Sequence, residues 1–161
     1  MYEVKCHSSK GGYVLCVCNG FQILTDTQLL KGSLLHNSSH KFICKNVHLG
    51  VSSKSSPITR SLEEKGIFKI PIAHGEGRFQ SDDETLKSRN ENGQVMLRYV
   101  DNFVNPSHES NPNGSIENIA GISNYEGNVM GMMPHPERAS DENLLNTDGL
   151  ALFQSILNSR T

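Results

Sequence analysis

The sequence lacks a long apolar stretch, a secretion signal and an excess of charge of either sign. No apolar run approaches the roughly 20 residues that cross a membrane, and the segment from Met1 to Gly11 has no apolar signal core. Lys and Arg total 15 against 17 Asp and Glu, a net charge of −2, which offers no basic surface for nucleic acid. The four cysteines are irregularly spaced, which favours reduced thiols. We therefore expect a cytoplasmic protein that binds neither membranes nor nucleic acid.

The chain of 161 residues contains no internal repeat and fits one domain, residues 1–161. Apolar patterning and turn residues predict several elements. The predicted strands are Gly12–Val17, Lys41–Val51, Ile67–Ala73, Gln94–Val100, Ile119–Ser123 and Asn128–Met133, and the predicted helices are Asn19–Leu30, Ser81–Arg89 and Asn146–Ser159. The last two strands flank a turn and predict a hairpin. Helices at both ends of a strand-rich middle indicate an α/β or α+β domain.

Cys18 lies where the first predicted strand meets the first predicted helix. Such a turn exposes the sulfur at a helix N-terminus, which favours the thiolate over the thiol. A thiolate is the nucleophile for covalent catalysis on a carbonyl. Asn19 would supply a backbone N–H to an oxyanion hole, and Gly20 would leave room for a substrate. The alternative is a buried structural cysteine, the commonest role of a free cysteine.

His135 lies between Pro134 and Pro136 after an apolar strand. The prolines restrict the backbone on both sides and present the imidazole on a stiff loop. Glu137 lies two residues on, so in an extended chain its carboxylate shares a face with His135. This pattern fits a base held by a carboxylate. The alternative is a surface loop with an incidental pair.

Two further histidine patterns have structural alternatives. His74 and Gly75 follow a strand in Ile70–Gly77, where glycines permit close approach of a ligand or simply form a turn. His36, His40 and Cys44 recur every four residues and could ligate zinc on a helix. The strand-like residues around them argue against zinc, because a four-residue step in a strand spans about 13 Å. We therefore expect no metal.

Together these segments resemble class I glutamine amidotransferases, and more narrowly the glutaminase subunits of phosphoribosylformylglycinamidine synthase. The similar segments are Val17–Gln22, Ile70–Gly77, Arg98–Asp101, Asn111–Ser115, Asn118–Ile122 and Gly131–Ala139. The resemblance implies a flavodoxin-like α/β three-layer sandwich, incomplete at its N-terminal side.

The resemblance also implies a reaction in which a Cys18, His135 and Glu137 triad hydrolyses glutamine. The positions implied to bind substrate are Asn19, Gly20, Gln22, His74 and Gly75. No cofactor is implied in this chain. The implied partners are a synthetase subunit, which uses ATP and magnesium to amidinate formylglycinamide ribonucleotide with the ammonia, and a small bridging subunit.

The sequence departs from the family pattern in two places. Cys16 replaces a usual glycine two residues before the nucleophile, which questions the packing at the turn. Only about a dozen residues precede the predicted strand Gly12–Val17, which ends at Cys18, whereas a βαβ unit takes roughly 30. We therefore expect an open sheet edge at Gly12–Val17, a missing second oxyanion donor and weak glutaminase turnover. The alternative function is a catalytically impaired remnant that only binds its partner.

Overall fold

The computed structural model describes residues 1–63 and 66–159. The α-helices are α1 (Tyr2–Ser9), α2 (Asn19–Asp26), α3 (Asp83–Glu91) and α4 (Leu150–Asn158). The strands are β1 (Val14–Val17), β2 (Ser33–His36), β3 (Ile43–Val51), β4 (Ile67–His74), β5 (Glu76–Gln80), β6 (Val95–Val100), β7 (Ile119–Ser123) and β8 (Val129–Met132). Three 3₁₀ turns complete the set, namely η1 (Ile116–Asn118), η2 (Pro136–Ala139) and η3 (Glu142–Leu144).

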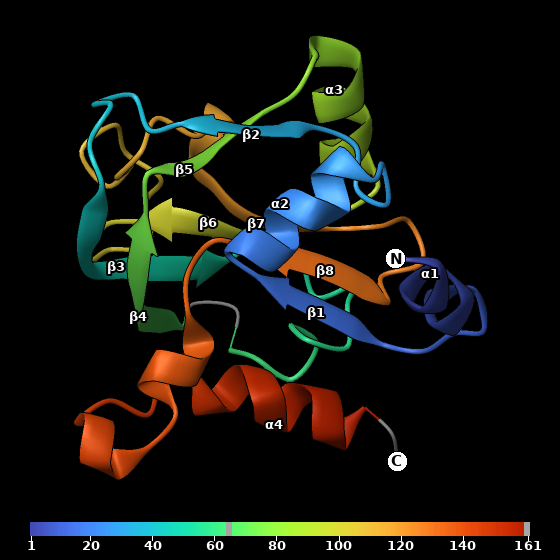
Figure 1. The fold of residues 1–161 in the computed structure, drawn as a ribbon. Helices are drawn as coiled ribbons and strands as arrows, with labels where there is room; N and C mark the ends of the chain where they lie inside the picture. Colours follow the sequence, from blue (N-terminus) through green and yellow to red (C-terminus); the bar gives the residue numbers. More distant parts are fainter. Residues whose placement is uncertain (64–65, 160–161) are drawn as a thin grey trace.

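Six strands form one mixed sheet in the order β1-β8-β7-β6-β3-β4 (Figure 1). The β1–β8 pair is parallel and the other four pairs are antiparallel. The predicted hairpin of Ile119–Ser123 and Asn128–Met133 is therefore confirmed as β7 and β8. Within the described part of the chain β1 pairs only with β8, so it forms an edge of the sheet, as expected from the sequence.

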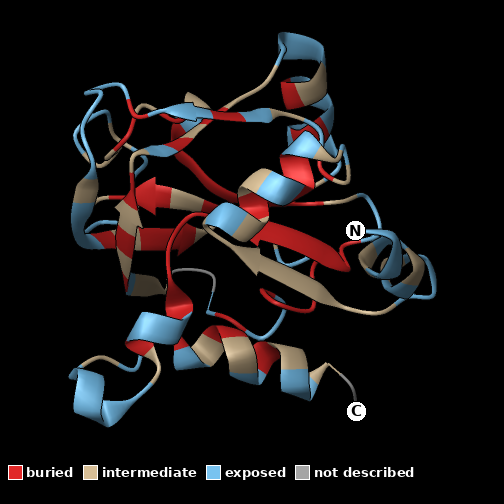
Figure 2. Ribbon diagram, in the orientation of Figure 1, coloured by how far each residue is buried: buried red, intermediate tan, exposed pale blue. Residues whose placement is uncertain are grey.

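Helices cover both faces of the sheet, which confirms the α/β layering (Figures 1 and 2). One face packs α2, the β2–β5 pair and α3 around buried residues such as Phe21, Leu24 and Phe79. The other face packs α4 and the segment that contains Ile58 against Ile70 and other sheet residues. Strands β7 and β8 are buried along their whole length. Their successive residues belong to different clusters, as Ile119 and Ala120 do, because successive residues of a strand point to opposite faces.

The structure differs from the sequence predictions mainly at element ends and in three short elements. The helix predicted over Asn19–Leu30 ends at Asp26, because Gln28 adopts a left-handed backbone with φ 58°. α1, β2 and β5 were not predicted. α1 buries none of its residues, so it leaves no apolar periodicity in the sequence. β2 and β5 are short, and each draws its stability from pairing with the other.

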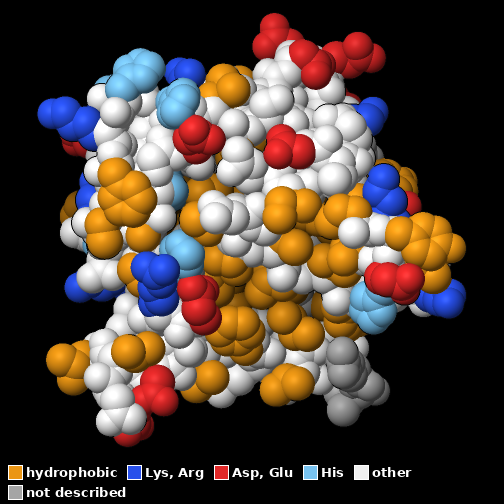
Figure 3. All heavy atoms as spheres, in the orientation of Figure 1, with side chains coloured by type: hydrophobic (Ala, Val, Ile, Leu, Met, Phe, Trp, Pro, Cys, Tyr) orange, Lys and Arg blue, Asp and Glu red, His pale blue; other side chains and the backbone are white. Residues whose placement is uncertain are grey.

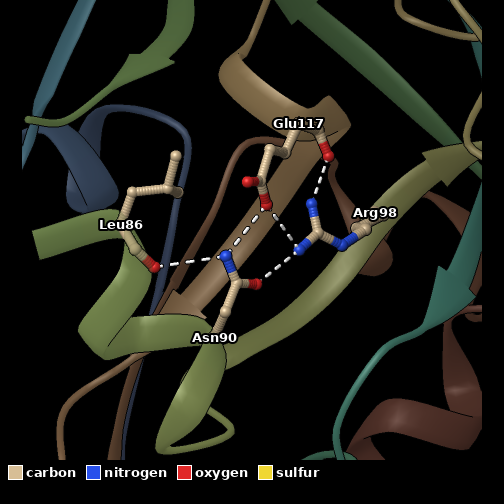
Figure 4. A network of polar contacts seen from close by, with 4 residues as sticks. All are labelled: Leu86, Asn90, Arg98 and Glu117. Carbon is tan, nitrogen blue, oxygen red and sulfur yellow. Dashed lines mark hydrogen bonds and ion pairs between the residues drawn. The ribbon is translucent and has the colours of Figure 1, made fainter. Parts of the chain in front are cut away.

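A polar network joins α3, β6 and η1 (Figure 4). The Arg98 guanidinium donates to the Asn90 side-chain oxygen at 2.8 Å and to the Glu117 carboxylate at 2.9 Å. It also donates to the backbone carbonyl of Glu117. The Asn90 amide donates to the same carboxylate at 3.0 Å and to the Leu86 carbonyl at 3.2 Å. These bonds hold Glu117 in a left-handed conformation, φ 47°.

The close packing of α2 on the sheet depends on Gly131 in β8. A Cβ at this position would lie 2.1 Å from the nearest ring atom of Phe21. Phe21 is fully buried and lies in the first turn of α2. The missing side chain therefore lets the aromatic ring rest on the strand itself and fixes the height of α2 above the sheet.

We expect Gly131→Ala to lower the free energy of unfolding by about 1–3 kcal/mol, because an added methyl in a filled core displaces its neighbours. Urea unfolding followed by circular dichroism measures the loss. Gly75→Ala is the matched control, since its nearest contact would lie at 4.0 Å. Equal midpoints for the two variants would contradict this account of the packing.

Candidate active site

Cys18 occupies a strained turn between β1 and α2. Its backbone has φ 54° and ψ −111°, a conformation that costs a non-glycine residue about 1–3 kcal/mol. Its N–H donates to the Met132 carbonyl at 2.8 Å, which extends the parallel β1–β8 ladder by one residue. Its carbonyl accepts from the Gln22 N–H in the first turn of α2. The strand and the helix together therefore fix the direction of the sulfur.

The structure corrects the expected role of Gly20. A Cβ at Gly20 would lie 3.1 Å from the Cys16 Cβ and 3.5 Å from its sulfur. The glycine thus makes room for the half-buried Cys16 and does not line the pocket that contains Cys18. Cys16 replaces a usual glycine of the family, and its side chain fits beside the turn because Gly20 has none.

The helix N-terminus was expected to favour the thiolate form of Cys18. The structure shows surroundings that favour the thiol instead. Burial raises the pKa of its thiol, and this effect exceeds the lowering by the Asn19 backbone N–H and by Arg138. Glu137 raises the pKa further. The sulfur lies 3.9 Å from both the Ala73 carbonyl oxygen and the Asn19 side-chain oxygen. The resting sulfur is therefore a thiol that needs a base.

His135 and Glu137 lie together, and His135 lines the same cavity as Cys18. The His135 N–H donates to the Pro71 carbonyl at 2.8 Å, which ties the loop to β4. Its side-chain Nδ1 lies 2.6 Å from the Glu137 Oε1. Its Nε2 is buried and has no hydrogen-bond partner among the described residues. Glu137 therefore orients the ring through one nitrogen and leaves the other free to exchange a proton.

A cavity of about 620 Å³ joins these groups, a size that suits a small ligand. Its lining includes Cys18, Asn19, Gln22, His74, Gly75 and His135. The structure therefore brings together every sequence-predicted site residue except Gly20, which faces Cys16, and Glu137, which lies behind His135. Cys18 and His135 share the cavity without a hydrogen bond between the sulfur and Nε2.

The sequence analysis missed five residues that line the same cavity, namely Val17, Phe42, Ala73, Glu76 and Arg138. The Glu76 carboxylate accepts from the Gln22 amide at 3.3 Å and approaches His36 Nδ1 at 3.4 Å. Arg138 Nε lies 3.6 Å from the Glu137 carboxylate. Glu76 and Arg138 are neighbours of predicted site residues in the sequence, and that adjacency was the available signal. Phe42 is an exposed aromatic in a loop and gave none.

The zinc alternative finds no support in the structure. No group of three or more His, Cys, Asp and Glu side chains could hold a metal ion within residues 1–63 and 66–159. The ring centroids of His36 and His40 lie 6.3 Å apart, and His36 pairs with Glu76.

The described helices include none long and apolar enough to cross a membrane.

Comparison with known proteins assigns the family. Residues 3–149 match the profile of the CobB/CobQ-like glutamine amidotransferase domain. The chain belongs to the CobB/CobQ-like glutamine amidotransferase family. It is 51% identical over 150 residues to the phosphoribosylformylglycinamidine synthase subunit PurQ of Aquifex aeolicus, with 93% of this chain and 66% of the relative covered. The corresponding PurQ of Thermosynechococcus vestitus is 50% identical, with 98% of this chain and 68% of the relative covered.

A solved structure of the same family has the same fold. A chain in the structure of PurLQS from Thermotoga maritima superposes with a TM-score of 0.83 and 44% sequence identity, covering 99% of this chain and 68% of that chain. The glutamine amidotransferase fold expected from the sequence is thereby shown. The chain spans about two thirds of the length of the curated relatives it matches.

The raised pKa of Cys18 predicts how it reacts with iodoacetamide. Its alkylation rate should keep rising above pH 9, the ordinary pKa of a thiol, because only the thiolate is alkylated. Arg138→Gln should move the profile to still higher pH, since Arg138 lowers this pKa, and Arg60→Gln on a distant surface should leave it unchanged. Mass spectrometry of the Cys18 peptide gives the rate. A plateau well below pH 9 would show that the thiolate already dominates in the resting protein.

Proposed function

We propose that this chain is a glutaminase whose nucleophile is Cys18. The single observation that carries the proposal is the shared cavity, which is lined both by a cysteine on a strained turn and by a histidine oriented by a carboxylate. Membership of a glutamine amidotransferase family supports the choice of glutamine as substrate.

The first half of the proposed reaction forms a thioester. His135 Nε2 takes the thiol proton, and the Cys18 sulfur attacks the carboxamide carbon of glutamine. The Asn19 backbone N–H, at the start of α2, donates to the oxyanion that forms. The oxyanion collapses, the C–N bond breaks, and the imidazolium returns its proton to the leaving nitrogen, which departs as ammonia. Glu137 stabilises the imidazolium between these two transfers.

The second half restores the enzyme. A water molecule loses a proton to His135 Nε2 and attacks the thioester carbon. The C–S bond breaks, glutamate leaves, and the imidazolium returns the proton to the sulfur. The raised pKa of the thiol favours this last transfer. The triad therefore needs no cofactor in this chain.

The proposed role of the ammonia is to feed a synthetase. PurQ is named as a subunit of phosphoribosylformylglycinamidine synthase in the relatives, and the Thermotoga chain comes from a PurLQS structure. By analogy, this chain would deliver ammonia in the cytoplasm to an ATP- and magnesium-dependent synthetase, which amidinates formylglycinamide ribonucleotide, with a small bridging subunit in the complex. The alternative function, a partner-binding remnant, is favoured by the missing hydrogen bond between Cys18 and His135.

Ammonia and glutamate release, measured with and without the synthetase, tests the proposal. Cys18→Ser should abolish release. Glu137→Gln should lower kcat by roughly 10²–10⁴, because it removes the charge that supports the acid–base histidine. Glu126→Gln, an exposed carboxylate outside the cavity, is the matched control and should leave kcat unchanged. Release that survives Cys18→Ser contradicts the proposal. Tight binding to the synthetase without any release would establish the remnant.

A further inference from the structure

Asn37, in the loop after β2, is hydrogen-bonded to His74 at the end of β4. Its side-chain Nδ2 donates to the carbonyl oxygens of Lys41 and His74, each at 2.8 Å. Its backbone N–H donates to the Gly75 carbonyl at 2.9 Å. Asn37 is fully buried and His74 is 4% exposed. A further hydrogen bond joins the Asn37 side-chain Oδ1 to the imidazole Nδ1 of His74 itself, at 3.0 Å.

These contacts decide which nitrogen of His74 carries the hydrogen. Carbonyl oxygens only accept, so the side of the Asn37 amide that faces two of them must be its NH₂ group. The opposite atom, Oδ1, can only accept, and it lies 3.0 Å from His74 Nδ1. His74 Nδ1 must therefore be the donor. In the neutral ring the hydrogen then sits on Nδ1, and Nε2 holds a lone pair.

The lone pair on His74 Nε2 is left unused by the protein. This atom is buried and has no hydrogen-bond partner in the described part of the chain. An unpaired buried acceptor destabilises the folded state, so its presence needs an explanation. His74 lines the same cavity as Cys18. Gly77 lets the ring sit where it does, because a Cβ there would lie 2.4 Å from the ring.

The ring is also kept neutral. Burial lowers the pKa of His74 to about 4, and the neighbouring His135 lowers it as well. His74 therefore carries no charge at neutral pH. A neutral ring with a fixed Nδ1–H is an acceptor, and never a donor, at Nε2.

We propose that His74 Nε2 accepts a hydrogen bond from the carboxamide N–H of glutamine, and that Asn37 is the positioning residue that imposes the required tautomer. This inference rests on the proposed glutaminase function. The arrangement selects the amide against the product acid. Glutamate has a carboxylate in place of the amide. Its oxygen lone pairs would face the lone pair of His74 Nε2, and no hydrogen bond could form between them. A site built to bond a substrate N–H discriminates strongly against a ligand that lacks it.

The tautomer is measured by ¹⁵N NMR of histidine-labelled protein, in the Cys18→Ser variant so that glutamine is not consumed. We expect His74 to be protonated at Nδ1 alone at pH 7. Saturating L-glutamine should move the Nε2 resonance in the direction of hydrogen bonding, and L-glutamate should not. A hydrogen on Nε2, or glutamine binding without a shift of this resonance, overturns the inference alone. Failure to bind glutamine overturns it together with the proposed function.

Asn37→Ala provides the second readout. Without the amide, both tautomers of His74 become accessible, so the ratio of the Kd for glutamate to the Kd for glutamine should fall at least tenfold. The NMR spectrum of the same variant should show a mixture of tautomers. Asn102→Ala, an exposed asparagine in a turn, is the matched control and should preserve the ratio. Weaker binding of both ligands by the same factor, with the tautomer unchanged, would show that Asn37 only supports the turn and would overturn the inference.

Discussion

The backbone of Cys18 is the constraint on which the rest of the site depends. A residue with a side chain adopts φ 54° and ψ −111° only when its surroundings hold it there. The ladder bond to Met132 holds it from the strand side, and Phe21 packed on Gly131 holds it from the helix side. The edge strand β1 has only one neighbour among the described residues, so α2 carries much of this support. Figure 3 shows hydrophobic side chains gathered over β1, between α2 and α4.

Two buried polar atoms near this turn have no hydrogen-bond partner among the residues that the structure describes. They are Nε2 of His135 and Nε2 of His74. The Nδ1 atom of each ring is bonded, to Glu137 in one case and to Asn37 in the other. A carboxylate supports a proton-carrying ring and a neutral amide supports a neutral one. In the proposed reaction the two histidines therefore have different roles. His135 moves the proton, and His74 accepts a hydrogen bond from the amide that receives it.

The sequence predicted the turn at Cys18, the His135–Glu137 pair and the positions of the six strands of the main sheet, because each depends on residues close together in the chain. It could not predict the roles of Asn37 and Gly20. Asn37 acts on His74 across 37 positions. Gly20 and Cys16 are close in the chain, but their contact depends on the angle at which α2 packs against β1. The thiolate prediction failed for a related reason. A helix start is visible in sequence, but the burial that outweighs it arises only when distant segments pack over the sulfur.

The most direct test of the account is covalent labelling with a chloroketone analogue of glutamine, followed by peptide mass spectrometry. The account predicts one adduct, at Cys18, which glutamine prevents and which forms far more slowly in His135→Asn. Cys44 is exposed and serves as the internal reference for nonspecific alkylation. Labelling of Cys18 at no more than the rate of Cys44, or labelling that glutamine does not prevent, would contradict a glutamine site built on this turn.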